Sequence, residues 1–507
     1  MAAPKDAKGP GESGPDADTG GASGAGWSGT TALAVGGGAL LLLAGVLLGV
    51  RRAGAGHGDG HDEEKRVSTQ AGATAGDGTG RRGRTAGTRK VAALLTAAAA
   101  VGTLTALPAR AAESAPPPAY SFDPAAQRIA GAASSADAKP MDPGKTYRDT
   151  LKKDGKLYYR LHLDTLRNSY VSAVAVPQPG GKTAYGDGFK ITIQDGSGTT
   201  CGYQDVSFGS GEYVRPLTAY AQRIVHPDVS SCQEAGTYYV IVERESDATS
   251  TPDDWELELQ HVTEPLLKQN GPDKLPDSWP SGTPEPVAGE PRERQGGNGF
   301  HDAVSLDTGE WRADIRPGQT LFWRVPVDWG QQLFASAELG SSDKGDDLVS
   351  YALALGLDNP ARGFVDLQTV GFSGDPATAT LAPRRPVDHK NRSSYESATT
   401  GMRFAGWYYL TATLSPEIAQ EYGDGPVPLI LRVTVRGDRR QGPGYDGDPG
   451  VFQVTKDDRK AAASGATGAE VTGDSTMVAV AAGGLGLGTV LLVGLGGWTL
   501  WARRAAR

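Results

Sequence analysis

The sequence has few of the side chains that build metal centres and disulfide-rich scaffolds. Among 507 residues there are two cysteines and seven histidines. Two cysteines are too few for a disulfide-stapled small scaffold or a cysteine-rich zinc domain. The five histidines after residue 111 stand one per segment without HExxH spacing, which argues against a zinc site: His162, His226, His261, His301 and His389.

Motifs for common catalytic chemistries are missing as well. The string GFSG at 371–374 lacks the glycine spacing of a nucleophile elbow, which needs a glycine two residues before and two after the serine. The Gly/Ser/Thr loops at 196–200 and 209–211 have no P-loop lysine. We therefore expect no enzymatic activity and no cofactor. The alternative is an extracellular hydrolase with an unrecognised active site, or an accessory subunit of one.

Acidic residues outnumber basic ones. The chain carries 50 Lys and Arg against 59 Asp and Glu, a net charge of -9. The part expected outside the cell is acidic, because most of the Asp and Glu residues lie there. Nucleic acids bind basic surfaces, so a nucleic-acid partner is disfavoured.

A long apolar run lies near the end of the chain. It extends from Met477 to Leu500 without a charge and is followed by Trp501, Arg503 and Arg504. At about 1.5 Å per residue, such a helix covers the roughly 30 Å core of a bilayer, and basic residues after it favour a cytoplasmic end. We expect a type I cell-membrane protein with most of its chain outside the cell.

An export signal is expected further upstream. An apolar run over 91–107, too short to span a membrane comfortably, follows five basic residues: Arg81, Arg82, Arg84, Arg89 and Lys90. Ala109 and Ala111 supply the small residues that a signal peptidase recognises, so cleavage is expected between Ala111 and Ala112. This assigns 67–111 as the signal peptide region.

The first 66 residues contain a further apolar run at 31–50, closed by Arg51 and Arg52. One interpretation is an additional membrane helix with an outside N-terminus and a cytoplasmic loop after it. The other is that translation begins at Val67, read as a GTG start codon, so that residues 1–66 do not belong to the protein.

Composition divides the part expected outside the cell into segments. The Ala/Pro/Ser-rich stretch 112–140 and the Pro-rich stretch 265–300 are predicted to be flexible linkers, and 437–476 is predicted to be a Gly/Asp/Ala-rich stalk. Two domains lie between them, at 141–264 and 301–436, each long enough for a core of its own. After the membrane helix at 477–500, residues 501–507 form the expected cytoplasmic tail.

Both cysteines fall in the first of these domains. In an oxidising compartment an isolated pair forms a disulfide, and closing the loop between Cys201 and Cys232 stabilises the fold by roughly 3 to 4 kcal/mol in the chain-entropy model. A metal site would need more ligands at short spacing, and a catalytic thiol needs no partner. We therefore expect a disulfide.

Both domains are predicted to be β-structure, because short alternating segments are separated by Gly, Asp, Asn and Pro turns. The first contains such segments at 157–163, 170–176, 189–193, 238–243 and 255–259; the second at 311–315, 320–327, 332–339, 350–357, 406–414 and 429–435. Helical periodicity is confined to 219–225 and a turn at 416–422. The pattern predicts two tandem antiparallel β-sandwiches.

The two domains share motifs at their beginnings and ends. The first has GKTY at 144–147, KLYYRL at 156–161, GTYYVIV at 236–242 and WELEL at 255–259; the second has PGQTLFWRVP at 317–326 and GWYYL at 406–410. These resemble the bacterial pre-peptidase C-terminal (PPC) domain family. The resemblance implies jelly-roll-like sandwiches that serve as accessory modules, although no peptidase domain accompanies them. The Ala/Gly-rich, Arg-over-Lys composition is similar to that of actinobacterial surface proteins.

The aromatic residues and the acidic clusters offer the remaining candidate sites. Most aromatics are expected to pack in the core or at its rim: Tyr158, Tyr159, Tyr238, Tyr239, Trp323, Trp407, Tyr408 and Tyr409. Trp255, Trp311 and Trp329 could instead contribute to a carbohydrate platform. Some PPC domains hold calcium; here two acidic clusters are favoured as solvated turns over calcium ligands: Asp343, Asp346 and Asp347, and Asp253, Asp254 and Glu256.

These observations predict a membrane-anchored, non-enzymatic surface protein. Its two β-sandwich modules would bind or assemble with an envelope protein or a cell-wall glycan, and the lipid bilayer would hold the anchor. A carbohydrate-binding or wall-binding protein is the second alternative. The Pro-rich linker is expected to hold the first domain farther from the membrane than the second.

Overall fold

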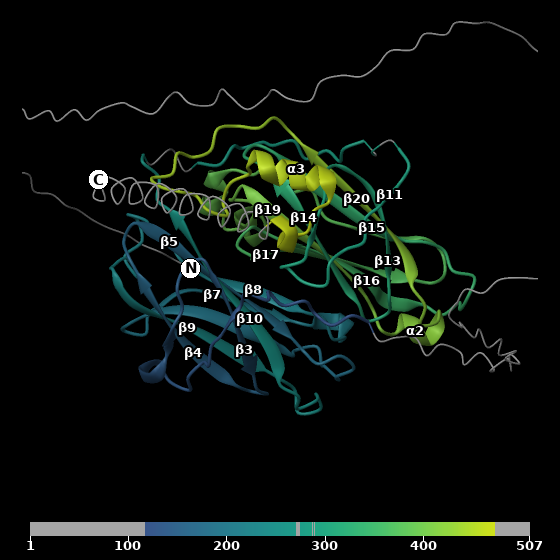
Figure 1. Cartoon of the computed structure of the whole chain (residues 1–507), viewed down its shortest axis with the longest axis horizontal. Helices are drawn as coiled ribbons and strands as arrows, with labels where there is room; N and C mark the ends of the chain where they lie inside the picture. Colours follow the sequence, from purple (N-terminus) through teal and green to yellow (C-terminus); the bar gives the residue numbers. More distant parts are fainter. Residues whose placement is uncertain (1–116, 270–273, 286, 288, 472–507) are drawn as a thin grey trace, which may run out of the picture. The chain divides into compact units, whose positions relative to one another are not determined.

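The computed structural model describes residues 117–269, 274–285, 287 and 289–471. Four five-stranded sheets pair into two β-sandwiches, which confirms the all-β prediction (Figure 1). The predicted membrane helices at 31–50 and 477–500 and the signal peptide region at 67–111 lie outside the described residues. Within the described ranges, no helix combines the length and apolar character needed to cross a bilayer.

Sandwich one contains strands β1 to β10 and two short 3-10 turns. The strands are β1 Gln127–Arg128, β2 Lys139–Pro140, β3 Lys145–Leu151, β4 Lys156–Leu163, β5 Arg167–Val176, β6 Gly188–Asp195, β7 Thr200–Ser207, β8 Leu217–Arg223, β9 Gly236–Glu245 and β10 Trp255–Pro265; the turns are η1 Ser135–Asp137 and η2 Gly209–Gly211.

Sandwich two contains strands β11 to β20 and four short helical segments. The strands are β11 Arg292–Glu293, β12 Val304–Ser305, β13 Gly309–Ile315, β14 Thr320–Val327, β15 Gln332–Leu339, β16 Val349–Asp358, β17 Phe364–Phe372, β18 Ala377–Thr380, β19 Gly406–Leu414 and β20 Val427–Arg436; the helices are η3 His389–Ser393, α1 Ser397–Gly401, α2 Ile418–Glu421 and α3 Lys456–Ser464.

The two sandwiches have the same strand order. In sandwich one the sheets run β1-β3-β10-β5-β8 and β2-β4-β9-β6-β7; in sandwich two they run β11-β13-β20-β15-β18 and β12-β14-β19-β16-β17. Adding ten to each number converts one sandwich into the other. In all four sheets a two-residue strand pairs in parallel with its neighbour, and the longer strands pair antiparallel. The shared motifs therefore belong to an internal structural duplication.

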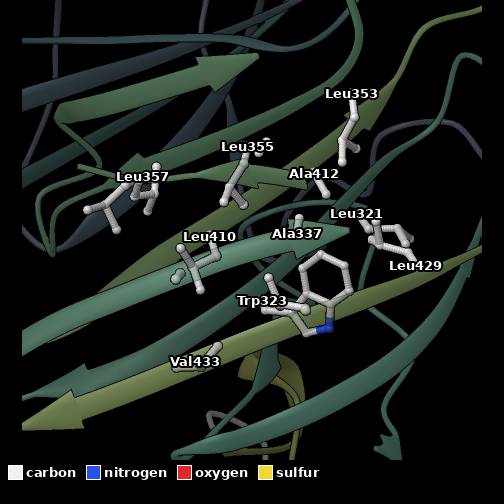
Figure 2. Close-up of a cluster of buried hydrophobic side chains, with 14 of the residues drawn as sticks. Leu321, Trp323, Ala337, Leu353, Leu355, Leu357, Leu410, Ala412, Leu429 and Val433 are labelled. Atoms are coloured by element: carbon white, nitrogen blue, oxygen red, sulfur yellow. The ribbon is translucent and has the colours of Figure 1, made fainter. Parts of the chain in front are cut away.

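Side-chain alternation builds each core. On β14, Leu321 and Trp323 point into the core of sandwich two, which they share with Leu410 of the adjacent strand β19, Leu355 of β16 in the same sheet and Leu429 of the facing sheet (Figure 2). The aromatic residues of the shared motifs fall into a buried and a half-buried set, as side-chain alternation along a strand requires. Four are at most 3% exposed, namely Tyr159, Tyr238, Trp323 and Tyr408, whereas Tyr158, Tyr239, Trp407 and Tyr409 are half-buried.

One sheet of each sandwich is buried on both faces. On β5, Val171 and Ala173 face the core of sandwich one. Their neighbours Tyr170 and Val174 lie in separate clusters with Phe404 and Phe322 of sandwich two. The outer face of sheet β1-β3-β10-β5-β8 thus packs against the outer face of sheet β12-β14-β19-β16-β17 and its adjoining loops. We call this contact the seam.

The segments expected to be flexible take part in the fold. Within 117–140, residues 127–128 and 139–140 form strands, and Tyr120 packs against the ring of Phe322. In the Pro-rich stretch, the carbonyl of Pro280 accepts a hydrogen bond from Gln332 at 2.8 Å. Composition predicted flexible linkers here, but these parts of the segments pack on the sandwiches. A few aromatic side chains and backbone carbonyls are enough to hold a low-complexity segment in place.

The segment expected to be a stalk, 437–476, also packs on the sandwiches in its described part. Phe452 is 0% exposed and stacks on Phe404 in the seam. The following helix α3 begins with a capping box between Thr455 and Asp458, which satisfies backbone donors at its N-terminus. Of the two predicted helical segments, α2 confirms the turn at 416–422. The helical prediction at 219–225 is wrong, because the alternating burial of 217–223 is that of strand β8.

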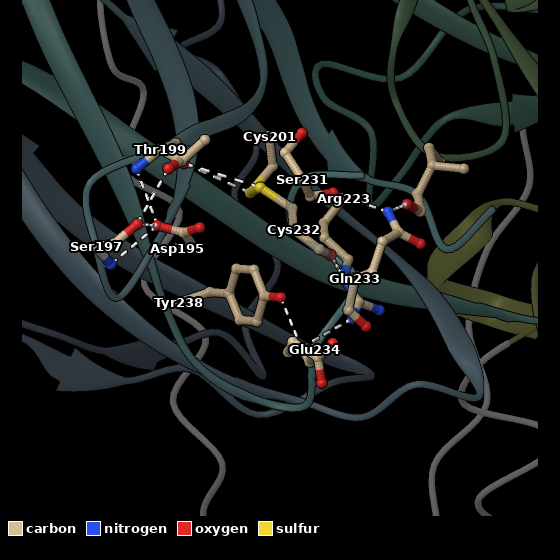
Figure 3. The surroundings of a disulfide bond; sticks show 11 residues. Asp195, Ser197, Thr199, Cys201, Arg223, Ser231, Cys232, Gln233, Glu234 and Tyr238 are labelled. Carbon is tan, nitrogen blue, oxygen red and sulfur yellow. Dashed lines mark hydrogen bonds between the residues drawn. A yellow bond between two sulfur atoms is a disulfide. The ribbon is translucent and has the colours of Figure 1, made fainter. Parts of the chain in front are cut away.

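The predicted disulfide between Cys201 and Cys232 is confirmed, with Cα atoms 5.7 Å apart (Figure 3). Beside it, the fully buried Arg223 donates hydrogen bonds to the backbone carbonyls of five residues: Asp164, Arg167, Cys232, Gln233 and Glu234. The bond and the guanidinium together hold the loop before β9 against strands β7 and β8.

Replacing both cysteines, as Cys201→Ser with Cys232→Ser, should lower the free energy of unfolding by about 3 to 4 kcal/mol, because the unfolded chain is no longer closed across a separation of 31 residues. Urea denaturation of the variant and the oxidised protein measures the change. Reduced wild-type protein is the matched control and should behave like the variant. Equal midpoints for oxidised and reduced protein would contradict the prediction.

Candidate functional site

The three tryptophans considered for a carbohydrate platform are buried. Trp255, Trp311 and Trp329 are 2%, 0% and 7% exposed. Arg244 covers the ring of Trp255 at 3.8 Å from its centroid, and Arg292 covers that of Trp311 at 3.9 Å. Stacking on a sugar needs an open ring face, so these residues do not form such a platform.

The acidic clusters and histidines stay apart. No group of three or more His, Cys, Asp or Glu side chains in the described ranges lies in a position to hold a metal ion. The turn around Asp343 is exposed. Among the histidines, His261 is buried and contacts Ser169, whereas His301 lies 3.5 Å from Asp123. The residues brought together by the fold are different ones, and they lie at the seam.

Strand β10 carries two buried carboxylates on its outer face. Glu258 and Glu264 are 0% and 2% exposed. Side chains alternate along a strand, so residues six apart share a face, and here that face is opposite Leu257 and Leu259 of the core. A buried carboxylate is costly unless it is paired and hydrogen-bonded. Each of these two carboxylates must therefore find its partners among the residues that pack at the seam.

Glu258 is paired with Arg362 of sandwich two. The Arg362 Nη1 atom lies 2.5 Å from Glu258 Oε1, and the backbone N–H of Asp123 donates to Oε2 at 3.1 Å. Arg362 occupies the β16–β17 hairpin with a positive φ of 57° and its guanidinium lies 4.8 Å from the centroid of the Phe300 ring. Although burial lowers it, Glu258 and the nearby tyrosines raise the pKa of Arg362 above its ordinary value. Arg362 is therefore charged.

Glu264 forms the second polar contact across the seam. Its carboxylate accepts hydrogen bonds from Tyr170 at 2.7 Å and Asn168 at 2.9 Å in sandwich one, and from Tyr445, beyond β20, at 2.7 Å. Burial first, and Glu264 second, raise the pKa of Tyr445, which keeps its hydroxyl a donor. His389 lies 3.7 Å from the same carboxylate.

Two cavities open along the seam. One has a volume of about 270 Å³ and lies between 204–207 and 215–218 of sandwich one and the outer face of strands β14, β16 and β19; we call it the Asp358 cleft. The other has a volume of about 400 Å³, and its lining includes Glu264, Arg392 and Arg403. A Cβ atom added at Gly356 would lie 2.5 Å from Thr411 Oγ1, so the glycine keeps the floor of the Asp358 cleft open.

Asp358 is the chemically unusual residue of the first cleft. It ends strand β16, is 6% exposed and lines the cavity. Among the described residues, its carboxyl has no side-chain hydrogen bond or ion pair. Burial raises its pKa from 3.8 to about 7, against the opposing charge of Arg362. A carboxyl of this kind is available to accept from, or donate to, a group that enters the cleft.

Sequence patterns did not identify the seam residues, because alternation assigns an outward-facing Glu or Arg to solvent. A signal was nevertheless present in two strands. The strings SAVAV at 172–176 and ALALGL at 352–357 are almost continuously apolar. Such runs are typical of strands buried on both faces, and they point to an outer face that is covered.

No family model and no curated protein matches the chain. Among solved structures, tripeptidyl peptidase 2 aligns at a TM-score of 0.18 with 8% identity over 64% of this chain, which spans 28% of that protein's chain. The tandem CBM22-1-CBM22-2 domain of Paenibacillus barcinonensis Xyn10C aligns at 0.16 with 11% identity, covering 59% of this chain and 92% of its own. The ANX1 ectodomain of Arabidopsis thaliana aligns at 0.18 with 10% identity, covering 60% and 86%. Scores this low carry no argument about function.

Breaking the buried ion pair should destabilise the protein strongly. Arg362→Met leaves the Glu258 charge buried without its partner and should cost about 3 to 5 kcal/mol in urea denaturation. The matched control is Arg432→Met, which breaks an ion pair with Glu310 and Glu338 whose arginine is 33% exposed; it should cost about 1 kcal/mol or less. If both variants lost the same free energy of unfolding, the buried pair at the seam would contribute no more to stability than the exposed pair.

Asp358 should make the protein less stable as the pH rises. Its pKa is about 7 in the folded protein against 3.8 for an exposed aspartate, so between these pH values the folded state holds a proton that the unfolded state has released. Stability contributed by this group is therefore lost as the pH rises through that window. The free energy of unfolding of Asp358→Asn should equal that of wild type near pH 4 and exceed it by up to about 4 kcal/mol at pH 8. A pH-independent difference in urea denaturation would contradict this assignment; the comparison cancels other groups such as His261.

Proposed function

We propose that the protein is a non-enzymatic, membrane-anchored surface component whose two sandwiches together bind or assemble with an envelope partner. The observation that carries the proposal is the pair of cavities along the seam. Ligand sites favour domain interfaces, and a surface held rigid before binding loses less entropy when a partner docks. Glu258, Arg362 and Glu264 supply that rigidity.

The strand order supports the finer fold assignment. Within sandwich one, β3-β10-β5-β8 faces β4-β9-β6-β7, and the equivalent strands of sandwich two repeat the arrangement. Eight strands in two four-stranded sheets with this order correspond to a jelly roll. We propose that both sandwiches are jelly-roll modules of the PPC-like kind, used for display and recognition.

The disulfide supports a location outside the cytosol, because such bonds persist in oxidising compartments. Together with the apolar run at 477–500 and the export signal at 67–111, it favours a type I protein of the cell membrane. Since the seam joins the sandwiches, we propose that they face the envelope as one body and not as two separately tethered modules.

Site-specific crosslinking in intact cells tests this function. Phe364 lines the Asp358 cleft and is 38% exposed, so a photo-crosslinking amino acid placed there should capture a discrete envelope partner. The control position is Tyr185, which is 61% exposed and does not line the cleft. The same adducts from both positions, or none from Phe364, would contradict the proposal.

Protease added to whole cells tests the location separately. Both sandwiches should be cut or released while cytoplasmic proteins survive. Protection of the sandwiches in whole cells, with cleavage after lysis, would place them inside the cell and contradict the surface assignment.

A further inference from the structure

We propose that the Asp358 cleft binds one neutral saccharide unit of a hydroxyl-rich glycan. This inference rests on the proposed function and names the ligand class of the same surface. It depends on three properties of the cleft: an unpartnered buried carboxyl, a lining of hydroxyl and apolar groups, and a volume suited to a single small unit.

The carboxyl of Asp358 is the first argument. Asp358 is 6% exposed and has no hydrogen-bond partner among the described residues, yet its oxygen atoms are not sealed from solvent, so a donor that enters the cleft can reach them. A sugar hydroxyl supplies such a donor and can also accept a proton in return. Because Asp358 lines the cavity, its oxygen atoms are placed to meet a ligand there.

The remaining lining combines polar groups with apolar walls. Five hydroxyl side chains border the cavity: Ser207, Thr218, Thr320, Thr411 and Thr413. The apolar side is formed by Phe322, Phe364 and Leu367. A sugar ring presents both hydroxyl edges and apolar C–H faces, so this mixture matches it on both counts. The hydroxyls of Thr320 and Thr413 are 2.9 Å apart, and each retains further hydrogen-bonding capacity.

Charge and size narrow the choice. Among the described residues that line the cleft, the charged ones are Asp205, Asp358 and Arg215, so carboxyl groups outnumber cations and an anionic ligand is disfavoured. Arg215 is already held by the carbonyl of Phe208 at 2.9 Å. The volume of about 270 Å³ lies just below the ~300–1,000 Å³ of most ligand pockets. This space suits one ring of a longer chain, whose neighbouring units would extend along the seam.

Sandwich one and sandwich two both contribute to the cleft. Residues 204–207 and 215–218 form one wall and strands β14, β16 and β19 form the other. The site therefore exists only while the seam is closed. This dependence separates saccharide binding in the cleft from incidental adhesion to either sandwich alone.

Isothermal titration of the full-length chain in detergent tests the inference. The probes are chitin-derived oligomers of N-acetylglucosamine, neutral hexose oligomers and, as a charged comparator, polyol phosphate. At pH 8, where the Asp358 carboxyl is ionised, at least one neutral oligomer should bind, and Asp358→Asn should weaken its binding about tenfold or more, as expected for a hydrogen bond to a charged group. The matched control Asp343→Asn lies in an exposed turn and should bind like wild type.

The outcomes separate this inference from the function on which it rests. Urea denaturation at pH 8 should show Asp358→Asn to be folded and at least as stable as wild type, so that lost binding is not lost folding. Binding of polyol phosphate alone, no binding of any neutral oligomer, or equal weakening by both variants would overturn the saccharide assignment. If Phe364 still captures an envelope protein in that case, the proposed function stands and only the ligand class fails.

Discussion

The structure depends on the burial of Glu258 between the two sandwiches. A carboxylate that is wholly removed from water on the outer face of a sheet is tolerated only with a charged partner, and Arg362 supplies it from the other sandwich. Removing either sandwich would expose Tyr170, Phe322 and the surrounding apolar surface as well. Each sandwich therefore covers the apolar outer face of the other.

The duplication explains the fold but not the seam. The pairing registers make Glu258 of β10 equivalent to Ile430 of β20, so the inner patterns are alike and the outer faces have diverged. The seam joins non-equivalent sheets, the one containing β10 in sandwich one and the one containing β19 in sandwich two. Such a contact is heterologous, and only one copy needs the buried carboxylates. Divergence of outer faces thus gave each sheet a separate role.

The same divergence produces the clefts. Where large side chains meet, as at Phe300 and Phe322, the seam is filled. Where Gly356 and the threonines stand, it is hollow, and Asp358 is left beside the space. Ligand sites commonly place a few polar groups in a mostly apolar cavity. The proposed recognition of an envelope glycan rests on this combination of a hollow and a carboxyl beside it. On this proposal the seam both stabilises the fold and binds the ligand.

The sequence alone determined the β-structure, the two sandwiches and the disulfide, because alternation of side chains and the pairing of two isolated cysteines are local or compositional properties. It also suggested the duplication through its repeated aromatic motifs. Only the tertiary structure decided that Trp255 and Trp311 are covered, that the low-complexity segments dock, that Glu258 and Arg362 meet across the seam, and that Asp358 lines a cleft there. Their encounter depends on which outer face packs against which, a choice made between elements about a hundred residues apart, and no local pattern records it.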